Sequence, residues 1–449
     1  MGRLFGTDGV RGVANRELTP QLAFRLGRAG AWVLGKNKER PCVLIGKDTR
    51  ASGDMLEDAL SAGVLSMGGD VVKAGVLPTP AVAYLVRHWK ADAGAVISAS
   101  HNPYEYNGIK FFNGEGYKLD DAIEEEIEAI VLGEKEPGEP AEGGGLGRCR
   151  DAAEAAAEEY IAYLKETAGV RLDGMKLAAD CANGAASLVA PRLFRELGAE
   201  LTVLSAAPDG VNINRDCGST HPEALQRAVR EQGAALGLAF DGDADRLMAV
   251  DETGEIVDGD KMICICAGKL KRDGRLPGNR VTATVMSNLG FHKAVEAMGC
   301  TVDVTQVGDR YVLESMRKTG SAIGGEQSGH IIFLEHSTTG DGMLSALQLL
   351  AAVKEGGGSL KALADPITIY PQVLKNAAVR NENKKKYAEH PGIVRAMAAM
   401  EEAMAGEGRI LIRPSGTEPL VRVMLEGSDI HKITGLAEEL AALITRELG

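Results

Sequence analysis

Short apolar runs alternate with amphipathic segments along most of the chain. Runs rich in Val, Leu, Ile and Ala are typical of buried strands, and apolar positions three and four residues apart are typical of helices that pack on them. Such alternation indicates parallel sheets with helices on their faces. We expect strands at 42–45, 71–76, 93–97, 176–180, 201–204, 236–240, 281–286 and 302–306, and helices at about 20–34, 54–67, 80–89, 152–168, 222–233, 290–298, 310–318 and 341–355.

The pattern changes after Pro366 to a shorter mixed segment, with strands expected at 409–412 and 421–425 and a helix from about 430. A stretch at 134–147 is rich in Gly, Pro and Glu and is expected to be a surface loop or linker. The chain is also too long for one hydrophobic core. We therefore expect an α/β fold of three consecutive α/β domains with mixed, mainly parallel sheets and one smaller α+β domain, over residues 1–155, 156–257, 258–368 and 369–449.

The composition narrows the class of protein. Asp and Glu number 63 against 50 Lys and Arg, and the resulting net charge of -13 disfavours a nucleic-acid-binding protein. The seven cysteines form no Cys-x-x-Cys pair, which argues against a disulfide framework or a zinc site. No stretch approaches the roughly 20 apolar residues of a membrane helix, and no apolar leader opens the chain. We expect a cytoplasmic protein with no membrane or nucleic-acid partner.

The first chemically suggestive segment follows the apolar run at 93–97. It reads Ser98-Ala99-Ser100-His101-Asn102-Pro103, and its proline cannot continue a strand ladder. Ligands of parallel sheets collect at the carboxyl ends of strands, so Ser100 is a candidate nucleophile or phosphate carrier. The alternative is that Ser100 only caps a turn or a helix, since no Ser-His-Asp arrangement of a hydrolase accompanies it.

Three carboxylates follow the strand expected at 236–240, in Asp241-Gly-Asp243-Ala-Asp245-Arg246. So much negative charge in one tight turn is costly unless a divalent cation lies among the carboxylates. A calcium EF-hand does not fit, because Arg246 occupies the place of its glycine. Mg²⁺ suits the site better if a phosphate shares its coordination, and the alternative is a solvated acidic turn. With Ser100, such a site would serve a phosphoserine intermediate, whereas no Walker phosphate loop is present.

Three further loops carry candidate ligand-binding groups. Arg413-Pro-Ser415-Gly416-Thr417-Glu-Pro, with Arg422 on the following strand, is a candidate phosphate cradle, or alternatively an exposed turn. The segment 6–12, Gly-Thr-Asp-Gly-Val-Arg-Gly, is expected to be a glycine-rich loop whose exposed amides and Arg11 face an anion, or a plain turn. The third loop contains Glu326, Ser328 and His330, which are candidates for contacts to sugar hydroxyls. The alternative is a hairpin turn in which these polar residues are incidental.

Four motifs in this order resemble the α-D-phosphohexomutase superfamily and span essentially the whole chain. They are Ser-Ala-Ser-His-Asn-Pro, Asp-Gly-Asp-Ala-Asp-Arg, Gly-Glu-Gln-Ser-Gly-His and Arg-Pro-Ser-Gly-Thr-Glu-Pro. Within the superfamily, the segment 6–12, the segment Val-Gly-Asp-Arg-Tyr-Val at 307–312 and Gln327 resemble the phosphoglucosamine mutase branch. The phosphomannomutase and phosphoglucomutase branch often has a different residue at the place of Gln327.

The resemblance implies a four-domain, heart-shaped enzyme with its active site in a central cleft. Phosphorylated Ser100 would pass its phosphoryl group to glucosamine 6-phosphate. The resulting glucosamine 1,6-bisphosphate would turn over and return the other group, leaving glucosamine 1-phosphate for amino-sugar nucleotide and cell-wall precursor synthesis. One Mg²⁺ per chain would be held by Asp241, Asp243, Asp245 and an oxygen on Ser100.

The resemblance also implies roles for single residues. His101 and Lys110 are candidates for general acid/base work and charge stabilisation, with a merely structural role as the alternative. Arg11 and Arg246 would steady the phosphoserine, and Arg310 would contact the substrate. The phosphate that is not reacting would be held by Arg413, Ser415, Gly416, Thr417 and Arg422.

The partner expected from the resemblance is a small sugar phosphate, and a homodimer is compatible with it. Three other functions stay open. The first is a phosphoglucomutase or phosphomannomutase, the second is a Mg²⁺-dependent phosphatase that uses the same serine, and the third is a sugar-phosphate sensor without catalysis.

Overall fold

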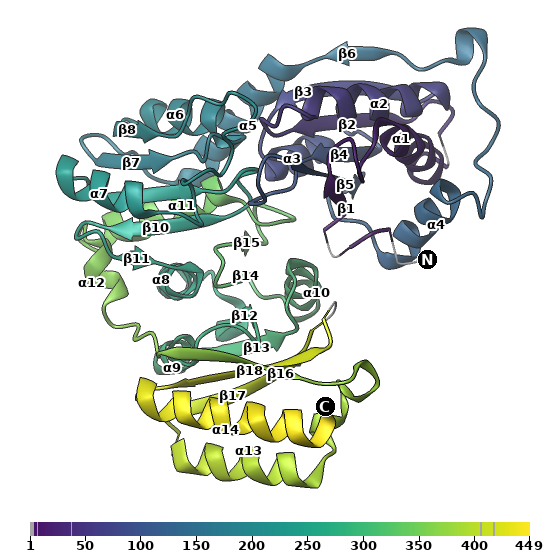
Figure 1. Ribbon diagram of the computed structural model, residues 1–449. Helices are drawn as coiled ribbons and strands as arrows, with labels where there is room; N and C mark the ends of the chain where they lie inside the picture. The colour runs from purple at the N-terminus through teal and green to yellow at the C-terminus, as the bar shows by residue number, and fades with distance from the viewer. Residues whose placement is uncertain (1–3, 7, 37, 405, 416–417) are drawn as a thin grey trace. The chain divides into compact units, whose positions relative to one another are not determined.

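The computed structural model describes residues 4–6, 8–36, 38–404, 406–415 and 418–449, and Figure 1 shows the order of their elements. The chain forms two compact units. The first extends to Thr284 and includes Asp303–Asp365, and the second comprises Val285–Val302 and Pro366–Gly449. None of the described helices is long and apolar enough to cross a membrane.

The first sheet has six strands in the order β1-β5-β4-β2-β3-β6. Strands β2, β3, β4 and β6 run parallel, whereas β5 is antiparallel to β4 and β1 is antiparallel to β5. The strands are β1 (Val10–Val13), β2 (Cys42–Lys47), β3 (Asp70–Val76), β4 (Ala93–Ile97), β5 (Tyr106–Asn113) and β6 (Cys149–Asp151), and the helices are α1 (Pro20–Leu34), α2 (Gly53–Ser66), α3 (Thr79–His88) and α4 (Asp121–Val131).

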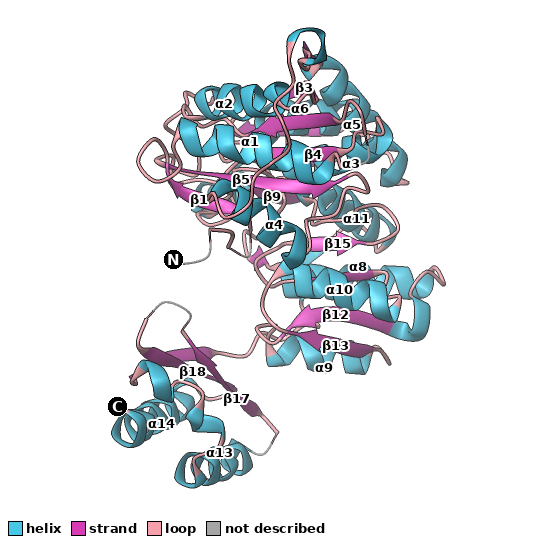
Figure 2. Ribbon diagram, turned by 90° about the vertical axis from the view of Figure 1, so that its right-hand side faces the viewer, coloured by secondary structure: helices cyan, strands magenta, loops and turns pink. Residues whose placement is uncertain are grey.

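Side chains alternate between the two faces of this sheet, so each face has its own helices. Val43 and Ile45 of β2 join the core formed with α1 and α2, which lie side by side in Figure 2. On the opposite face, a Cβ on Gly46 would lie 2.5 Å from Val82 of α3. Helix α1 begins as its sequence predicts, because the Thr19 side chain accepts a hydrogen bond from the Leu22 amide at 3.2 Å.

The second sheet has the order β11-β10-β9-β7-β8, and the third has the order β13-β12-β14-β15. In the second, β7, β8 and β9 are parallel and β10 returns antiparallel to β9. Their strands are β7 (Lys176–Asp180), β8 (Glu200–Leu204), β9 (Leu236–Phe240), β10 (Leu247–Asp251), β11 (Ile256–Val257), β12 (Arg280–Thr284), β13 (Thr301–Thr305), β14 (Ile323–Gly325) and β15 (Ile331–Phe333). The helices that accompany them are α5 (Ala153–Ala168), α6 (Ala186–Glu196), α7 (Glu223–Gln232), α8 (Gly259–Arg272), α10 (Asp309–Thr319), α11 (Gly342–Glu355) and α12 (Leu360–Ala364). Helix α9 (Leu289–Ala297) belongs to the second unit.

The second unit contains a three-stranded antiparallel sheet of order β16-β18-β17 with two long helices. Its core includes Val423 and Leu425 of the central strand and Leu440 and Ile444 of the last helix. The elements are β16 (Gln372–Ala378), β17 (Gly408–Pro414), β18 (Leu420–Gly427), α13 (Pro391–Met404) and α14 (Ile430–Leu448). Short 3-10 helices occur at Gly143–Gly145, Pro277–Asn279, Asn381–Asn383 and Lys386–Ala388.

All of the strands and helices expected from periodicity are present, and the segment 134–147 holds only a short 3-10 helix. The expected exposed loop at 6–12 is wrong in part, because Val10–Val13 forms strand β1 and pairs with β5. Gly9 allows β1 to pack closely on β5, since a Cβ there would lie 2.4 Å from the Ile109 carbonyl oxygen. Thr7 of the same segment lies outside the described residues.

Helices α1 and α2 approach closely because each has a glycine at their contact. A Cβ on Gly27 would lie 2.2 Å from the Leu60 carbonyl oxygen, and a Cβ on Gly63 would lie 2.2 Å from that of Phe24. Both added atoms would meet backbone, which cannot rotate away as a side chain can. The two glycines therefore determine the spacing of the helices that cover the first sheet.

We expect Gly63→Ala to lower the free energy of unfolding by about 1–3 kcal/mol, because the helices must separate. The matched control is Gly435→Ala in α14, where Gly435 is exposed and the new Cβ meets no described atom within 4 Å. That control should raise the free energy of unfolding by about 0.5–1 kcal/mol through the better helix propensity of Ala. Urea unfolding followed by circular dichroism measures both, and equal stability for the two variants would refute the close contact.

Candidate active site

Ser100 lies where the first sheet meets the second. It follows the fully buried strand β4 through Ser98 and Ala99, and its φ of 52° places a non-glycine residue in the left-handed region. The side chain is buried, and its Oγ donates a hydrogen bond to Asp241 Oδ2 at 2.6 Å. Two strand ends 141 residues apart in sequence therefore bring the candidate phosphate carrier and the candidate metal site into direct contact.

Arg50 holds the backbone of the Ser100 loop, and sequence reasoning missed it. Its side chain is fully buried against Asp48, whose Oδ2 accepts hydrogen bonds from Arg50 Nε at 2.8 Å and from Ser98 Oγ at 2.6 Å. The guanidinium donates to the Ser100 carbonyl oxygen at 2.9 Å, and also to the carbonyls of Asn102, Pro103 and Tyr106. The available signal was the polar Asp-Thr-Arg sequence at the carboxyl end of β2, a parallel neighbour of β4.

The connection between β8 and α7 also contributes to this loop. Asn214 Nδ2 donates to the carbonyl oxygens of Ser100 at 2.9 Å and Asn102 at 3.1 Å. Gly242, in the acidic turn, allows the two loops to touch, because a Cβ there would lie 2.4 Å from the Ser100 carbonyl oxygen. The glycine of the acidic motif is thus a packing requirement of this junction.

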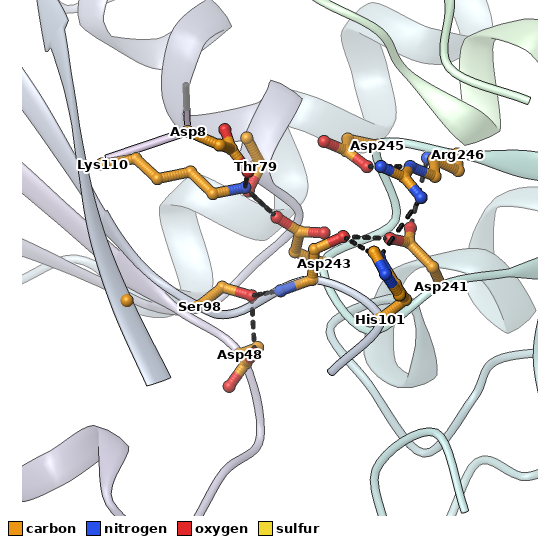
Figure 3. Close-up of polar contacts among 12 residues, drawn as sticks. Asp8, Asp48, Thr79, Ser98, His101, Lys110, Asp241, Asp243, Asp245 and Arg246 are labelled. Atoms are coloured by element: carbon orange, nitrogen blue, oxygen red, sulfur yellow. Dashed lines mark hydrogen bonds and ion pairs between the residues drawn. The ribbon is translucent and has the colours of Figure 1, made fainter. Parts of the chain in front are cut away.

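The three carboxylates of Asp241, Asp243 and Asp245 are buried and offer ligand atoms that all lie within 4.8 Å of one another. Asp243 Oδ1 and Asp245 Oδ1 accept no hydrogen bond from any described residue. Burial, together with the charges of Asp245 and Asp243, raises the pKa of Asp241 well above its usual value. Buried carboxylate oxygens without a hydrogen-bond partner at this spacing fit a divalent cation, so the residues present indicate a metal site (Figure 3).

Lys110 projects from β5 toward the same carboxylates. It is 2% exposed, and its Nζ lies 2.9 Å from Asp243 Oδ2 and 3.0 Å from Asp8 Oδ2. Thr79 Oγ1 donates to Asp243 Oδ2 as well, at 2.7 Å. Burial alone would lower the pKa of Lys110, but the charges of Asp243 and Asp8 outweigh it and raise the pKa. Lys110 is therefore held as an ammonium ion beside the metal site.

His101 and Arg246 lie on the other side of Ser100. His101 Nδ1 is 3.2 Å from Arg246 Nη1 and 3.5 Å from Ser100 Oγ. A guanidinium only donates hydrogen bonds, so Nδ1 is the acceptor and its lone pair faces Arg246. Burial lowers the pKa of His101, and the charges of Arg246 and Arg11 lower it further, so the imidazole is neutral. Arg11 itself forms an ion pair with Asp8.

The sugar-loop candidates lie in a hairpin between β14 and β15. Glu326 Oε1 accepts a hydrogen bond from the Gly308 amide at 3.1 Å, and His330 Nδ1 lies 3.5 Å from the metal-site Asp245 Oδ2. Ser328 is exposed. Gln327 Nε2 donates to Asp258 Oδ2 at 3.2 Å. Contacts of these residues to a sugar stay predictions.

The charge of Arg310 is already paired with acidic side chains of the first unit. Its Nη1 lies 2.7 Å from Asp121 Oδ1, and its Nε lies 3.1 Å from Glu314 Oε1. A contact between Arg310 and a substrate would have to replace at least one of these ion pairs. Its role in binding stays a prediction.

The phosphate-cradle candidates lie in the second unit. Arg413 of β17 is directly opposite Arg422 of β18, and burial together with the charge of Arg422 lowers the pKa of Arg413. Like charges at paired positions destabilise a sheet unless an anion lies between them. Lys384, another residue that sequence reasoning missed, donates to the Ser415 carbonyl oxygen at 2.9 Å. Gly416 and Thr417 lie outside the described residues.

Comparison with known proteins covers the whole chain. The models for phosphoglucomutase/phosphomannomutase alpha/beta/alpha domains I, II and III match residues 2–138, 158–254 and 258–370, and the model for the C-terminal domain of the same family matches residues 374–443. Curated relatives called phosphoglucosamine mutase are 57% identical over 449 residues in Alkaliphilus oremlandii and 58% identical over 448 residues in Thermoanaerobacter sp. strain X514, with 100% of this chain and of each relative covered.

Solved structures agree with this grouping. A phosphoglucomutase/phosphomannomutase family protein from Burkholderia thailandensis superposes with a TM-score of 0.80 at 25% identity, covering 99% of this chain and 97% of that one. The N-acetylphosphoglucosamine mutase of Aspergillus fumigatus, in complex with GlcNAc-6P and magnesium, shares the fold with a TM-score of 0.71 at 18% identity, covering 99% and 95%. The chain therefore belongs to the phosphoglucomutase/phosphomannomutase family and, within it, to the phosphoglucosamine mutases.

Proposed function

We propose that this chain interconverts glucosamine 6-phosphate and glucosamine 1-phosphate through a phosphorylated Ser100, and so feeds amino-sugar nucleotide and cell-wall precursor synthesis. The observation that carries the proposal is the hydrogen bond of 2.6 Å between Ser100 Oγ and Asp241, at a cluster of three buried carboxylates. Phosphoryl transfer requires mainly positioning and charge neutralisation, and both are available at this junction. Full-length relatives with this activity in their names support the choice of sugar.

Ser100 carries the phosphoryl group in two transfers. In the first, the bond from phosphorus to Ser100 Oγ breaks and a bond to the sugar C1 oxygen forms, while the C1 hydroxyl gives up its proton and Ser100 Oγ takes one up. The glucosamine 1,6-bisphosphate then turns over. In the second, the bond from phosphorus to the C6 oxygen breaks and a bond to Ser100 Oγ forms, while the serine hydroxyl gives up its proton and the C6 oxygen takes one up. Glucosamine 1-phosphate leaves with the serine phosphorylated again. The same intermediate acts as an activator when it charges an unphosphorylated Ser100.

A Mg²⁺ ion, one per chain, would be held by Asp241, Asp243, Asp245 and an oxygen on Ser100, where it offsets charge on the phosphoryl group and lowers the cost of approach by an anionic substrate. Lys110, kept as an ammonium, adds positive charge on the other side of Asp243. His101 is the candidate proton acceptor because its imidazole is neutral. Its Nδ1 becomes available when Arg246 turns from it to the phosphoryl group, and Arg11 adds a further positive charge.

The remaining candidates bind the parts of the substrate that do not react. Glu326, Ser328 and His330 contact sugar hydroxyls, and Arg310 joins them by leaving an acidic partner. Arg413, Ser415, Gly416, Thr417 and Arg422 hold the distal phosphate. Lys384 is our addition to this set, because its ammonium is fixed on the Ser415 carbonyl and would share the anion with the paired arginines.

Three broader expectations belong to the same proposal. The domains extend over 1–155, 156–257, 258–368 and 369–449, a division supported by the four matched segments of the family models. The protein acts in the cytoplasm on a small sugar phosphate. A homodimer is compatible with this function, and light scattering of the purified chain would measure its mass in solution.

The first test compares turnover on the 6-phosphates of glucosamine, glucose and mannose with catalytic glucosamine 1,6-bisphosphate present. We expect the highest kcat/KM for glucosamine 6-phosphate and very little released inorganic phosphate. Equal or better turnover of mannose 6-phosphate would overturn the choice of sugar. Stoichiometric release of phosphate would indicate a phosphatase, and binding without turnover would indicate a sensor.

The second test concerns the metal. Because three buried carboxylates repel one another without a cation, Mg²⁺ at about 100 times its Kd should stabilise the chain by about 2.7 kcal/mol. Asp243→Asn should remove most of this stabilisation, whereas Asp216→Asn, at an exposed acidic residue, should retain it. Thermal unfolding with and without Mg²⁺ measures the effect, and an equal rise in Tm for both variants would show that Mg²⁺ acts elsewhere.

A further inference from the structure

The environment of Lys110 extends well beyond the metal site. Among the described residues of the first unit, ionisable side chains from three sheets and their connections follow one another in alternating charge, and the series begins and ends at carboxylates of the acidic turn. In order, they are Asp243, Lys110, Asp8, Lys118, Asp309, His330 and Asp245.

Asp8 is shared between two ammonium groups. Its Oδ2 lies 3.0 Å from Lys110 Nζ, and its Oδ1 lies 2.6 Å from Lys118 Nζ. Lys110 and Phe112 are two residues apart on β5, so their side chains lie on the same face of the strand. Lys118 is paired with Phe112 across the turn that follows, so the two lysines also lie on one face. The position of the Asp8 carboxylate therefore depends on both lysines at once.

Lys118 also joins the first sheet to the sugar loop. Its Nζ lies 2.6 Å from Asp309 Oδ2, and both side chains are 16% exposed. Asp309 is the first residue of α10, directly after Gly308, whose amide donates to Glu326 Oε1 at 3.1 Å. Asp309 Oδ2 also lies 3.5 Å from His330 Nε2. The loop that carries the sugar-binding candidates is thereby connected to the carboxylate that holds Lys110.

We propose that Lys118 and Asp309 are positioning residues that fix Lys110 against the metal-site carboxylate through Asp8. The inference rests on the proposed function, in which the Lys110 ammonium acts at the transferring phosphoryl group. Without Lys118, the Asp8 carboxylate keeps Lys110 and Arg11 as its cationic partners among the described residues, and it draws Lys110 away from Asp243. A buried ammonium that shifts by even one ångström no longer offsets the charge for which it is placed.

Lys118→Met tests the proposal directly. We expect kcat to fall about 10–100-fold, as is typical when the outer support of an active-site group is lost. KM for glucosamine 6-phosphate should change less than about threefold, since Lys118 acts through Lys110 rather than on the sugar. The control is Lys269→Met in α8. Lys269 is comparably buried, at 12% exposed, and also contacts two carboxylates, Asp273 and Glu355, but it should retain the wild-type kcat.

Two further variants separate positioning from stability. Lys118→Met leaves Asp309 without its lysine and should lower Tm. Replacing both residues by apolar ones, Lys118→Met with Asp309→Leu, should recover Tm while kcat stays low. Recovery of kcat together with Tm would refute positioning. If Lys118→Met does not fold, the test uses Lys118→Arg, which keeps a cation between the two carboxylates and should retain most of kcat. A kcat of folded Lys118→Arg as low as that of Lys110→Met would also refute positioning.

A Lys110→Met background gives the final criterion. There, adding Lys118→Met should lower kcat no further, because the two residues act as one unit. If the two substitutions instead lower kcat independently, so that their factors multiply in the double variant, the inference is overturned while the proposed function stays intact. Failure of the wild-type chain to interconvert the glucosamine phosphates would instead refute the proposed function itself.

Discussion

Buried negative charge at the carboxyl end of β9 is the constraint on which the rest of this structure depends. Asp241, Asp243 and Asp245 lie together out of water, and burial plus mutual repulsion raise the pKa of Asp241. Such a cluster persists only if cations surround it. Lys110, Arg246 and the proposed Mg²⁺ supply that charge, and an anionic phosphoryl group can then approach. The positive charges that stabilise the buried carboxylates are thus the same charges that are proposed to assist phosphoryl transfer.

The backbone around this cluster is built for close approach and fixed position. Ser100 is held in the left-handed region by a buried network in which Arg50 binds four carbonyl groups of its loop, and Asn214, from the connection between β8 and α7, binds two of them. Gly242 allows the acidic turn to touch the Ser100 carbonyl. The proposed role of Ser100 as a phosphoryl carrier is favoured by this rigidity, because neither transfer then requires the serine to be repositioned.

Periodicity was sufficient to predict most of the parallel strands and the helices beside them, since these elements are long and bury a regular face. It missed the short parallel strands β6 and β14, the antiparallel strands β1, β5, β10, β11, β15 and β16, and helices α4, α8, α12 and α13. Ser100 and the three aspartates could be found because each follows an apolar strand. Asn214, Lys384 and Lys118 could not, because single polar residues acquire their meaning only from partners brought close by folding, up to 191 residues away in the case of Lys118 and Asp309. For Arg50, the polar sequence after β2 was a signal that was overlooked.

The central claim is that the hydroxyl of residue 100 carries the phosphoryl group between the two ends of the sugar. Intact-mass spectrometry of the chain after incubation with glucosamine 1,6-bisphosphate and Mg²⁺ tests it most directly. The account predicts one added phosphoryl group on the wild-type chain, lost again when glucosamine 6-phosphate is supplied, and none on Ser100→Ala. A wild-type mass that never changes, or the same addition on Ser100→Ala, would contradict it.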